Sequence, residues 1–170
     1  MQLGEILRRA ARRWPEKTAV IAGERQLDFR EYDRLANGFA NFLIAAGVRP
    51  GDRIASLMFN SPEYGVVHFG NARAGSVLVH IPPLYAEAEI VEILERTRPR
   101  LLVVDEAVQG RIGTEVRSAV PAVMAAGSPA FEDALTTDSG RPPDRTIEAA
   151  APVAMTFTGG TTGRPKGAVV

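Results

Sequence analysis

A glycine-rich segment of this chain lies between two apolar stretches, and its sequence is Thr156-Phe157-Thr158-Gly159-Gly160-Thr161-Thr162-Gly163-Arg164-Pro165-Lys166-Gly167-Ala168-Val169-Val170. Three glycines and three threonines stand within six residues, and a proline and a lysine follow. The β-prone flanks predict a strand, a loop and a second strand. Glycine lets backbone N–H groups approach an anion closely, and successive N–H groups form a concave anion site. With threonine hydroxyls and the ammonium group of Lys166 as further donors, the segment is suited to hold a polyphosphate.

The segment differs from the Walker loop of many kinases and ATPases. That loop requires Gly-Lys-Ser/Thr with a helix directly after it. Here Pro165 precedes the lysine, Gly167 follows it, and the apolar residues 168–170 predict a strand. A P-loop kinase or ATPase is therefore the weaker hypothesis. A Gly/Thr-rich hairpin turn with a solvated lysine is another alternative, because short motifs produce false matches.

The segment resembles the phosphate loop of the adenylate-forming enzymes, which include acyl-CoA synthetases, luciferases and the adenylation domains of peptide synthetases. Their pattern is Thr-Ser-Gly-Ser/Thr-Thr-Gly-x-Pro-Lys-Gly. The run from Thr158 to Gly167 matches it at every fixed place but one, where Gly159 replaces the usual serine and removes a hydroxyl donor. Shorter segments carry the same resemblance, in the family's order: Trp14-Pro15-Glu16-Lys17-Thr18-Ala19, Leu27-Asp28-Phe29-Arg30-Glu31-Tyr32, Gly47-Val48 with Gly51-Asp52-Arg53-Ile54, Asn60-Ser61-Pro62-Glu63 and Ala74-Gly75-Ser76-Val77.

The resemblance implies the N-terminal part of an ATP-dependent acid–thiol ligase, above all an acyl-CoA synthetase. In such an enzyme a carboxylate attacks the α-phosphate of ATP, pyrophosphate leaves, and coenzyme A or a carrier thiol takes the acyl group. The loop would hold the β- and γ-phosphates and stabilise the leaving pyrophosphate. ATP and Mg²⁺ are the implied cofactors, and coenzyme A and a small carboxylic acid are the other substrates. The implied nucleotide-binding residues are Thr158, Gly159, Gly160, Thr161, Thr162, Gly163, Arg164, Pro165, Lys166 and Gly167, with Lys166 in the catalytic role; no metal ligand is assigned.

The same resemblance implies that the chain holds only part of an active site. The family's adenine and ribose contacts, its Mg²⁺-associated glutamate, its acyl pocket and its C-terminal lysine-bearing domain would lie beyond Val170. We therefore expect an N-terminal piece of a longer enzyme that is inactive by itself and self-associates through apolar surface left by missing strands. A non-catalytic binding, regulatory or interaction module of the same fold is the alternative.

The composition is that of a globular domain and argues against several other classes of protein. With 45% hydrophobic and 24% charged residues, the chain is not disordered. Equal numbers of basic and acidic residues, 20 of each, argue against a nucleic-acid-binding protein. The absence of cysteine excludes disulfides, a thiol nucleophile and a cysteine zinc site. No apolar run approaches the roughly 18 residues of a membrane span. The N-terminus lacks the apolar core of a secretory signal, so we expect a cytoplasmic protein.

A group of arginines near the N-terminus, Arg8, Arg9, Arg12 and Arg13, needs its own interpretation. Basic segments of this kind occur in transit peptides, but nearby acidic residues argue against one. Charge runs usually lie on solvated helix faces, so a solvated face is the prediction here.

Hydrophobic periodicity predicts helices over residues 3–14, 30–46, 62–74, 87–96, 108–119 and 131–135, and strands over residues 18–22, 26–29, 54–59, 77–81, 101–104, 121–125 and 153–157. The first two strands form a hairpin. The later alternation predicts an α/β fold with a largely parallel sheet, flanked by helices in the doubly wound manner and truncated. We divide the chain into an α/β subdomain (1–135), a linker (136–151) and a strand–phosphate loop–strand segment (152–170). Ligands of such sheets bind at the carboxyl ends of the strands, where the loop after Phe157 would lie.

Four isolated side chains have both a structural and a functional interpretation. His80 ends a predicted strand and His68 lies in a predicted helix, and a structural role is expected for each. Asp105 follows a strand, where it is a ligand carboxylate or, as we favour, a helix cap. Tyr85 follows Pro82-Pro83 and either contacts a partner or covers the sheet edge.

Overall fold

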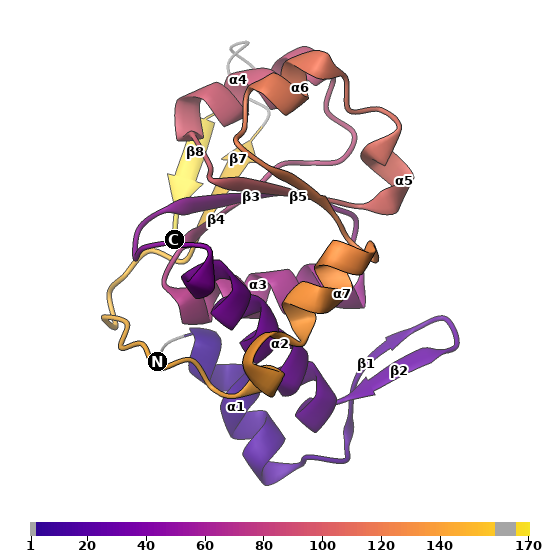
Figure 1. Ribbon diagram of the computed structural model, residues 1–170, viewed down its shortest axis with the longest axis vertical. Helices are drawn as coiled ribbons and strands as arrows, with labels where there is room; N and C mark the ends of the chain where they lie inside the picture. The colour runs from indigo at the N-terminus through magenta and orange to yellow at the C-terminus, as the bar shows by residue number, and fades with distance from the viewer. Residues whose placement is uncertain (1–2, 159–165) are drawn as a thin grey trace.

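The computed structural model of the chain describes residues 3–158 and 166–170. A six-stranded sheet with the strand order β6-β5-β3-β4-β7-β8 lies between two groups of helices (Figure 1). All neighbouring strands are parallel except β7 and β8, which are antiparallel. The predicted α/β fold with a largely parallel sheet is confirmed. The strands are β3 (Arg53–Leu57), β4 (Val77–His80), β5 (Leu101–Val104), β6 (Val123–Ala125), β7 (Ala154–Thr158) and β8 (Lys166–Val169).

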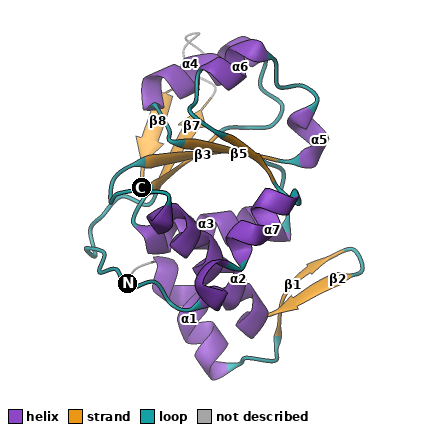
Figure 2. Cartoon of the chain, in the orientation of Figure 1, coloured by secondary structure: helices purple, strands orange, loops and turns teal. Residues whose placement is uncertain are grey.

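Helices cover both faces of the sheet (Figure 2). One face packs against α2 (Phe29–Ala45), α3 (Pro62–Ala74) and α7 (Pro129–Leu135), and α1 (Leu3–Arg13) packs on α2 and α3 from outside. The other face packs against α4 (Glu87–Thr97), α5 (Glu106–Gln109) and α6 (Thr114–Ser118). A separate antiparallel hairpin consists of β1 (Thr18–Ala22) and β2 (Arg25–Asp28). Within the described ranges, no helix is long and apolar enough to cross a bilayer.

The central strands are apolar on both faces because each contributes to two cores. In β3, Ile54 faces the core beneath α2 and α3, whereas its neighbours Ala55 and Leu57 face the core beneath α4. Burial on both faces explains why these strands lack an apolar–polar alternation in the sequence. On the α2 side, Phe39 and Phe131 are fully buried, and their ring centroids lie 6.0 Å apart.

N-cap residues determine where two of the helices that pack on the sheet, α2 and α3, begin. Asp28 caps α2 by accepting a hydrogen bond from the Glu31 N–H at 2.7 Å. Ser61 caps α3 in the same way by accepting from the Tyr64 N–H at 3.1 Å, and Pro62 occupies the first helical position. The Ser61 cap fixes the amino end of α3, where Tyr64 reaches His80 at the carboxyl end of β4.

The predicted continuous helix over residues 108–119 is wrong. The chain forms two short helices there, α5 and α6, and Gly113 is the N-cap of the second. A Cβ at Gly113 would lie 2.2 Å from a carboxylate oxygen of Glu87, so a larger residue here would require the Glu87 side chain to move. The predicted loop after α7 also contains a short 3₁₀ turn, Thr137–Gly140.

Candidate functional site

The β7–β8 hairpin frames the predicted phosphate loop. β7 runs parallel to β4, and the last register pair of the hairpin joins Thr158 to Lys166. The intervening segment therefore begins at the carboxyl edge of the sheet, where α/β proteins bind ligands. The prediction of a strand on each side is confirmed. Residues 159–165 lie outside the described residues, and the nucleotide-binding roles assigned to residues 158–167 stay predictions.

Gly167 has a packing role that the motif alone does not explain. It lies opposite Phe157 in the hairpin, and a Cβ at this position would lie 3.2 Å from the Cε1 and Cζ atoms of that ring. Phe157 is 5% exposed and belongs to the core beneath α4. Glycine at this position therefore lets β8 lie close against the ring that anchors β7.

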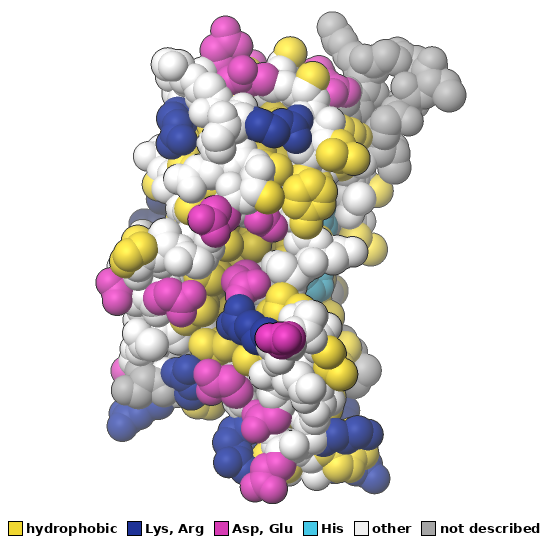
Figure 3. Space-filling model, turned by 90° about the vertical axis from the view of Figure 1, so that its right-hand side faces the viewer, with side chains coloured by type: hydrophobic (Ala, Val, Ile, Leu, Met, Phe, Trp, Pro, Cys, Tyr) yellow, Lys and Arg dark blue, Asp and Glu magenta, His cyan; other side chains and the backbone are white. Residues whose placement is uncertain are grey.

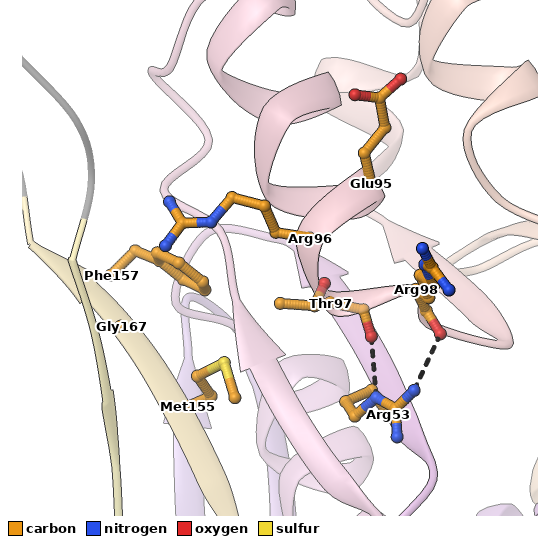
Figure 4. Close-up of a pocket in the computed structure, with 8 residues that line it drawn as sticks. All are labelled: Arg53, Glu95, Arg96, Thr97, Arg98, Met155, Phe157 and Gly167. Carbon is orange, nitrogen blue, oxygen red and sulfur yellow. Dashed lines mark hydrogen bonds between the residues drawn. The ribbon is translucent and has the colours of Figure 1, made fainter.

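A basic hollow of about 730 Å³ lies between α4 and this hairpin (Figure 4). The Nε of Arg53 donates to the Thr97 carbonyl at 2.7 Å, so this guanidinium braces the end of α4. The guanidinium carbon of Arg96 lies 5.7 Å from the Phe157 ring centroid. Positive charge and an aromatic surface thus flank the hairpin on its α4 side. The lining residues are Arg53, Glu95, Arg96, Thr97, Arg98, Met155, Phe157 and Gly167.

A second group of side chains, from α3 and the end of β4, lies on the opposite face of the sheet. The Tyr64 hydroxyl and Nδ1 of His80 share a hydrogen bond of 2.6 Å. The ring of His68 lies 5.6 Å from that of His80 between centroids. His80 is the register partner of Thr156 in β7, so this cluster adjoins the strand that delivers the predicted loop. Histidine atoms appear at the surface on the face shown in Figure 3.

The cluster is uncharged at neutral pH. Burial lowers the pKa of His80 to about 4, and the neighbouring His68 adds to this effect. Burial also lowers the pKa of His68 and raises that of Tyr64. Nδ1 of His68 is buried and has no hydrogen-bond partner among the described residues. Tyr64 and His68 of α3 thus pack against His80 at the end of β4. This packing agrees with the structural role expected for the two histidines.

The remaining candidates occupy structural positions. The carboxylate of Asp105 accepts a hydrogen bond from the Ala107 N–H at 3.1 Å and caps α5, which confirms the predicted cap. Tyr85 packs against the core beneath α4, and its carbonyl, like that of Pro83, accepts from Arg111. In residues 3–158 and 166–170, no three His, Cys, Asp or Glu side chains are grouped to hold a metal ion.

Comparisons with known proteins agree with this geometry. The family described as AMP-binding enzyme matches residues 7–170. The chain is 36% identical to a feruloyl-CoA synthase of an Amycolatopsis species, covering 99% of this chain and 33% of that protein. It is 34% identical to the phosphinothricin tripeptide synthetase PhsC of Streptomyces viridochromogenes, covering 97% of this chain and 15% of that protein.

A solved structure shows the same fold. The N-terminal domain of FACL13 from Mycobacterium tuberculosis superposes with a TM-score of 0.88 at 26% identity, covering 99% of this chain and 44% of that one. The chain thus spans a third or less of the two curated relatives' length and less than half of this structure. On the family match and the shared fold, the chain belongs to the AMP-binding enzymes, the adenylate-forming superfamily.

Proposed function

We propose that the chain is the N-terminal part of an ATP-dependent acid–thiol ligase and that the whole enzyme is an acyl-CoA synthetase. The family supports adenylate-forming chemistry, and the similarity to a feruloyl-CoA synthase supports coenzyme A as the acceptor. The observation that carries the proposal is the Gly/Thr/Lys segment placed between β7 and β8 at the carboxyl edge of the sheet. In this proposal the isolated chain is inactive, and it self-associates through the outer edge of β8.

The hairpin suits a nucleotide because its ladder ends at Thr158 and Lys166, which keeps both ends of the intervening segment adjacent. Ends that are already fixed reduce the ordering that ligand binding would otherwise require. ATP and Mg²⁺ would bind here, and the fixed donors would stabilise negative charge on the departing pyrophosphate. In this assignment the hydroxyl donors are Thr158, Thr161 and Thr162, the N–H donors are Gly159, Gly160 and Gly163, the cation is Lys166, and Pro165 stiffens the turn.

A carrier-protein thiol is the second candidate for the acceptor. The similarity to a fatty acid–[acyl-carrier-protein] ligase, ScoC of Streptomyces coeruleorubidus, at 35% identity, favours it. Both candidates share the first step, in which a small carboxylic acid reacts with ATP, and they differ only in the thiol that takes the acyl group. A cytoplasmic location, where ATP and coenzyme A are available, is part of the same proposal.

The test is acid-dependent exchange of pyrophosphate into ATP by a polypeptide that contains this chain together with the rest of the ligase. We expect Lys166→Ala to lower kcat/KM by about 100-fold or more, because one preorganised donor is lost. Lys17 is the only other lysine in the sequence, so Lys17→Ala is the matched control and should retain activity. Unchanged exchange in Lys166→Ala would contradict the proposal. Thioester formation with coenzyme A or with a carrier protein then distinguishes the two acceptors.

A further inference from the structure

The outer face of α1 carries an exposed stripe that the proposed function does not use. We define the α1 stripe as Ile6, Arg9, Ala10, Arg13 and Trp14. These residues recur at a spacing of three or four, which places the first four on one side of the helix, and Trp14 directly follows its last residue. They line a hollow of about 300 Å³ on the surface. Ile6 is 43% exposed and Trp14 is 47% exposed, although both are large and apolar. The stripe is therefore an amphipathic surface that faces solvent.

Basic charge is concentrated around this stripe although the whole chain has no net charge. Residues 3–17 contain five basic and two acidic side chains, against 20 of each in the whole sequence. Both acidic side chains have partners outside the stripe: Glu5 pairs with Arg8 at 2.7 Å, and Glu16 pairs with Arg30 at 3.0 Å. The net local charge is thus positive where the exposed apolar side chains lie.

The indole of Trp14 lies among these cations. The guanidinium carbon of Arg13 is 4.7 Å from the ring centroid, and the ammonium nitrogen of Lys17 is 5.7 Å from it. Within the part of the chain that the structure describes, no carboxylate forms an ion pair with Arg13. An indole beside arginines and an exposed isoleucine is typical of helices that lie in the interface of an anionic bilayer. There the indole sits at headgroup level and arginine stems extend toward the phosphates.

The position of α1 is compatible with such a surface. It lies at the opposite end of the molecule from α4 and α6, and away from the β7–β8 hairpin (Figure 1). A bilayer in contact with the α1 stripe therefore leaves the candidate functional site open. An acidic protein surface would also attract the arginines, but it would give Ile6 and the indole no apolar environment.

We propose that the α1 stripe binds the surface of bilayers that contain anionic phospholipid. The helix lies along the interface and does not cross it. The arginines contact lipid phosphates, and Ile6 and Trp14 enter the boundary between headgroups and acyl chains. This proposal is independent of the ligase activity, because none of these residues belongs to the predicted phosphate loop.

Trp14 is the only tryptophan in the sequence, so its fluorescence reports directly on the stripe. The 170-residue chain is titrated with vesicles of phosphatidylcholine alone and of phosphatidylcholine mixed with phosphatidylglycerol. We expect sedimentation with the mixed vesicles only, a blue shift of the emission, and quenching by lipid brominated on its acyl chains. An unchanged emission spectrum with the mixed vesicles, or equal binding to both kinds, would overturn the proposal.

Two double variants with the same change in net charge test the location of the site. Arg9→Glu/Arg13→Glu should weaken vesicle binding by about tenfold or more, because each basic residue contributes to attraction by anionic lipid. Arg117→Glu/Arg141→Glu reverses two exposed charges elsewhere and should bind like the unmodified chain. Circular dichroism checks that both are folded. Equal binding by the two variants would contradict the assignment to α1.

Ile6→Ser keeps every charge and separates insertion from simple charge attraction. It should reduce both the affinity for mixed vesicles and the blue shift of Trp14. Soluble polyglutamate is the competing ligand. Tight binding to polyglutamate together with no binding to vesicles would replace the bilayer by an acidic macromolecule and overturn the proposal.

Discussion

His80 is held neutral by its surroundings at the carboxyl end of β4. Its folded pKa is about 4, because burial disfavours the charged imidazolium and His68 lies nearby. The unfolded chain binds a proton near pH 6.5. The folded state therefore loses stability as the pH falls from about 6.5 to about 4, and the loss is complete below that window. The side chain is partly exposed, so we expect a loss of about 1–2 kcal/mol and not the full value of the shift.

The variant His80→Gln removes this titration. The measurement is the free energy of unfolding in urea at pH 7.5 and at pH 4.5, for both proteins. Carboxylates that titrate in the same range are common to both and cancel in the difference. We expect a smaller decrease in His80→Gln than in the unmodified chain. Equal decreases in the two proteins would show that His80 is not held neutral by the fold.

Residues in one continuous motif could be predicted from the sequence, whereas residues joined by packing could not. Lys166 and Gly167 belong to a pattern that is continuous in sequence, so both were identified as candidates. Tyr64 was not identified, because its bond to His80 spans 16 positions and depends on how α3 packs on β4. The hollow beside Phe157 was missed for the same reason, since its arginines come from β3 and α4.

At the scale of elements, α2 and α7 meet at Gly38. A Cβ at this position would lie 1.9 Å from the carbonyl oxygen of Leu135 and 2.4 Å from its carbonyl carbon. Neither atom can move without displacing the end of α7. We therefore expect Gly38→Ala to lower the free energy of unfolding by about 1–3 kcal/mol, although alanine favours a helix over glycine by about 1 kcal/mol.

Gly110 provides the matched control. A Cβ there meets nothing within 4 Å, and its φ of −68° suits any L-residue. Gly110→Ala should leave the free energy of unfolding unchanged or raise it by about 0.4–1 kcal/mol relative to the unmodified chain. The reason is that alanine reduces the conformational freedom of the unfolded chain. Urea unfolding compares the three proteins. A Gly38→Ala variant as stable as Gly110→Ala would mean that α2 and α7 do not pack at this distance.

Most elements could be predicted from apolar periodicity, and the exception shows the limit of that signal. Val108, Ile112 and Val116 recur every fourth residue, and all three are buried. The spacing correctly identified which side chains face the core. It could not show that the backbone leaves the helix between α5 and α6, because buried side chains recur at the same spacing on both sides of the break, which lies between the C-cap Gly110 and the N-cap Gly113.

At the scale of the whole molecule, the alternation of helices and strands predicted the layers but not the strand order. Each central strand is mostly apolar with buried residues on both faces, and that pattern does not distinguish the places of β3, β4 and β5 in the sheet. The observed order places β3 between β4 and β5, and β7 next to β4. This order pairs His80 with Thr156 in β7, the strand that leads to the predicted phosphate loop. The spacing of apolar residues in the sequence could not predict this pairing.

Arg73 joins the helices on the α2 side of the sheet into one unit. It is 4% exposed. Its Nε donates to the Gly4 carbonyl at 3.1 Å, and its terminal nitrogens donate to Asn37 Oδ1 at 2.6 Å and to the Asp33 carboxylate at 2.5 Å. These bonds connect α3 with α1 and α2. Burial lowers the pKa of this guanidinium, but Asp33 opposes the shift and the group stays charged.

Arg73→Met leaves the Asp33 carboxylate and the Gly4 carbonyl without their partner. We expect a loss of about 3–5 kcal/mol in the free energy of unfolding, because a buried charge pair is broken from one side. Arg73→Lys should recover only part of this, since one ammonium group cannot reproduce the planar fork that reaches α1 and α2 together. Hydrogen exchange provides a local measurement: amides of α1 should exchange faster in both variants than in the unmodified chain, and the sheet should change less. If Arg73→Lys matched the unmodified chain in stability and in the exchange of α1, the guanidinium would not be what holds these helices together.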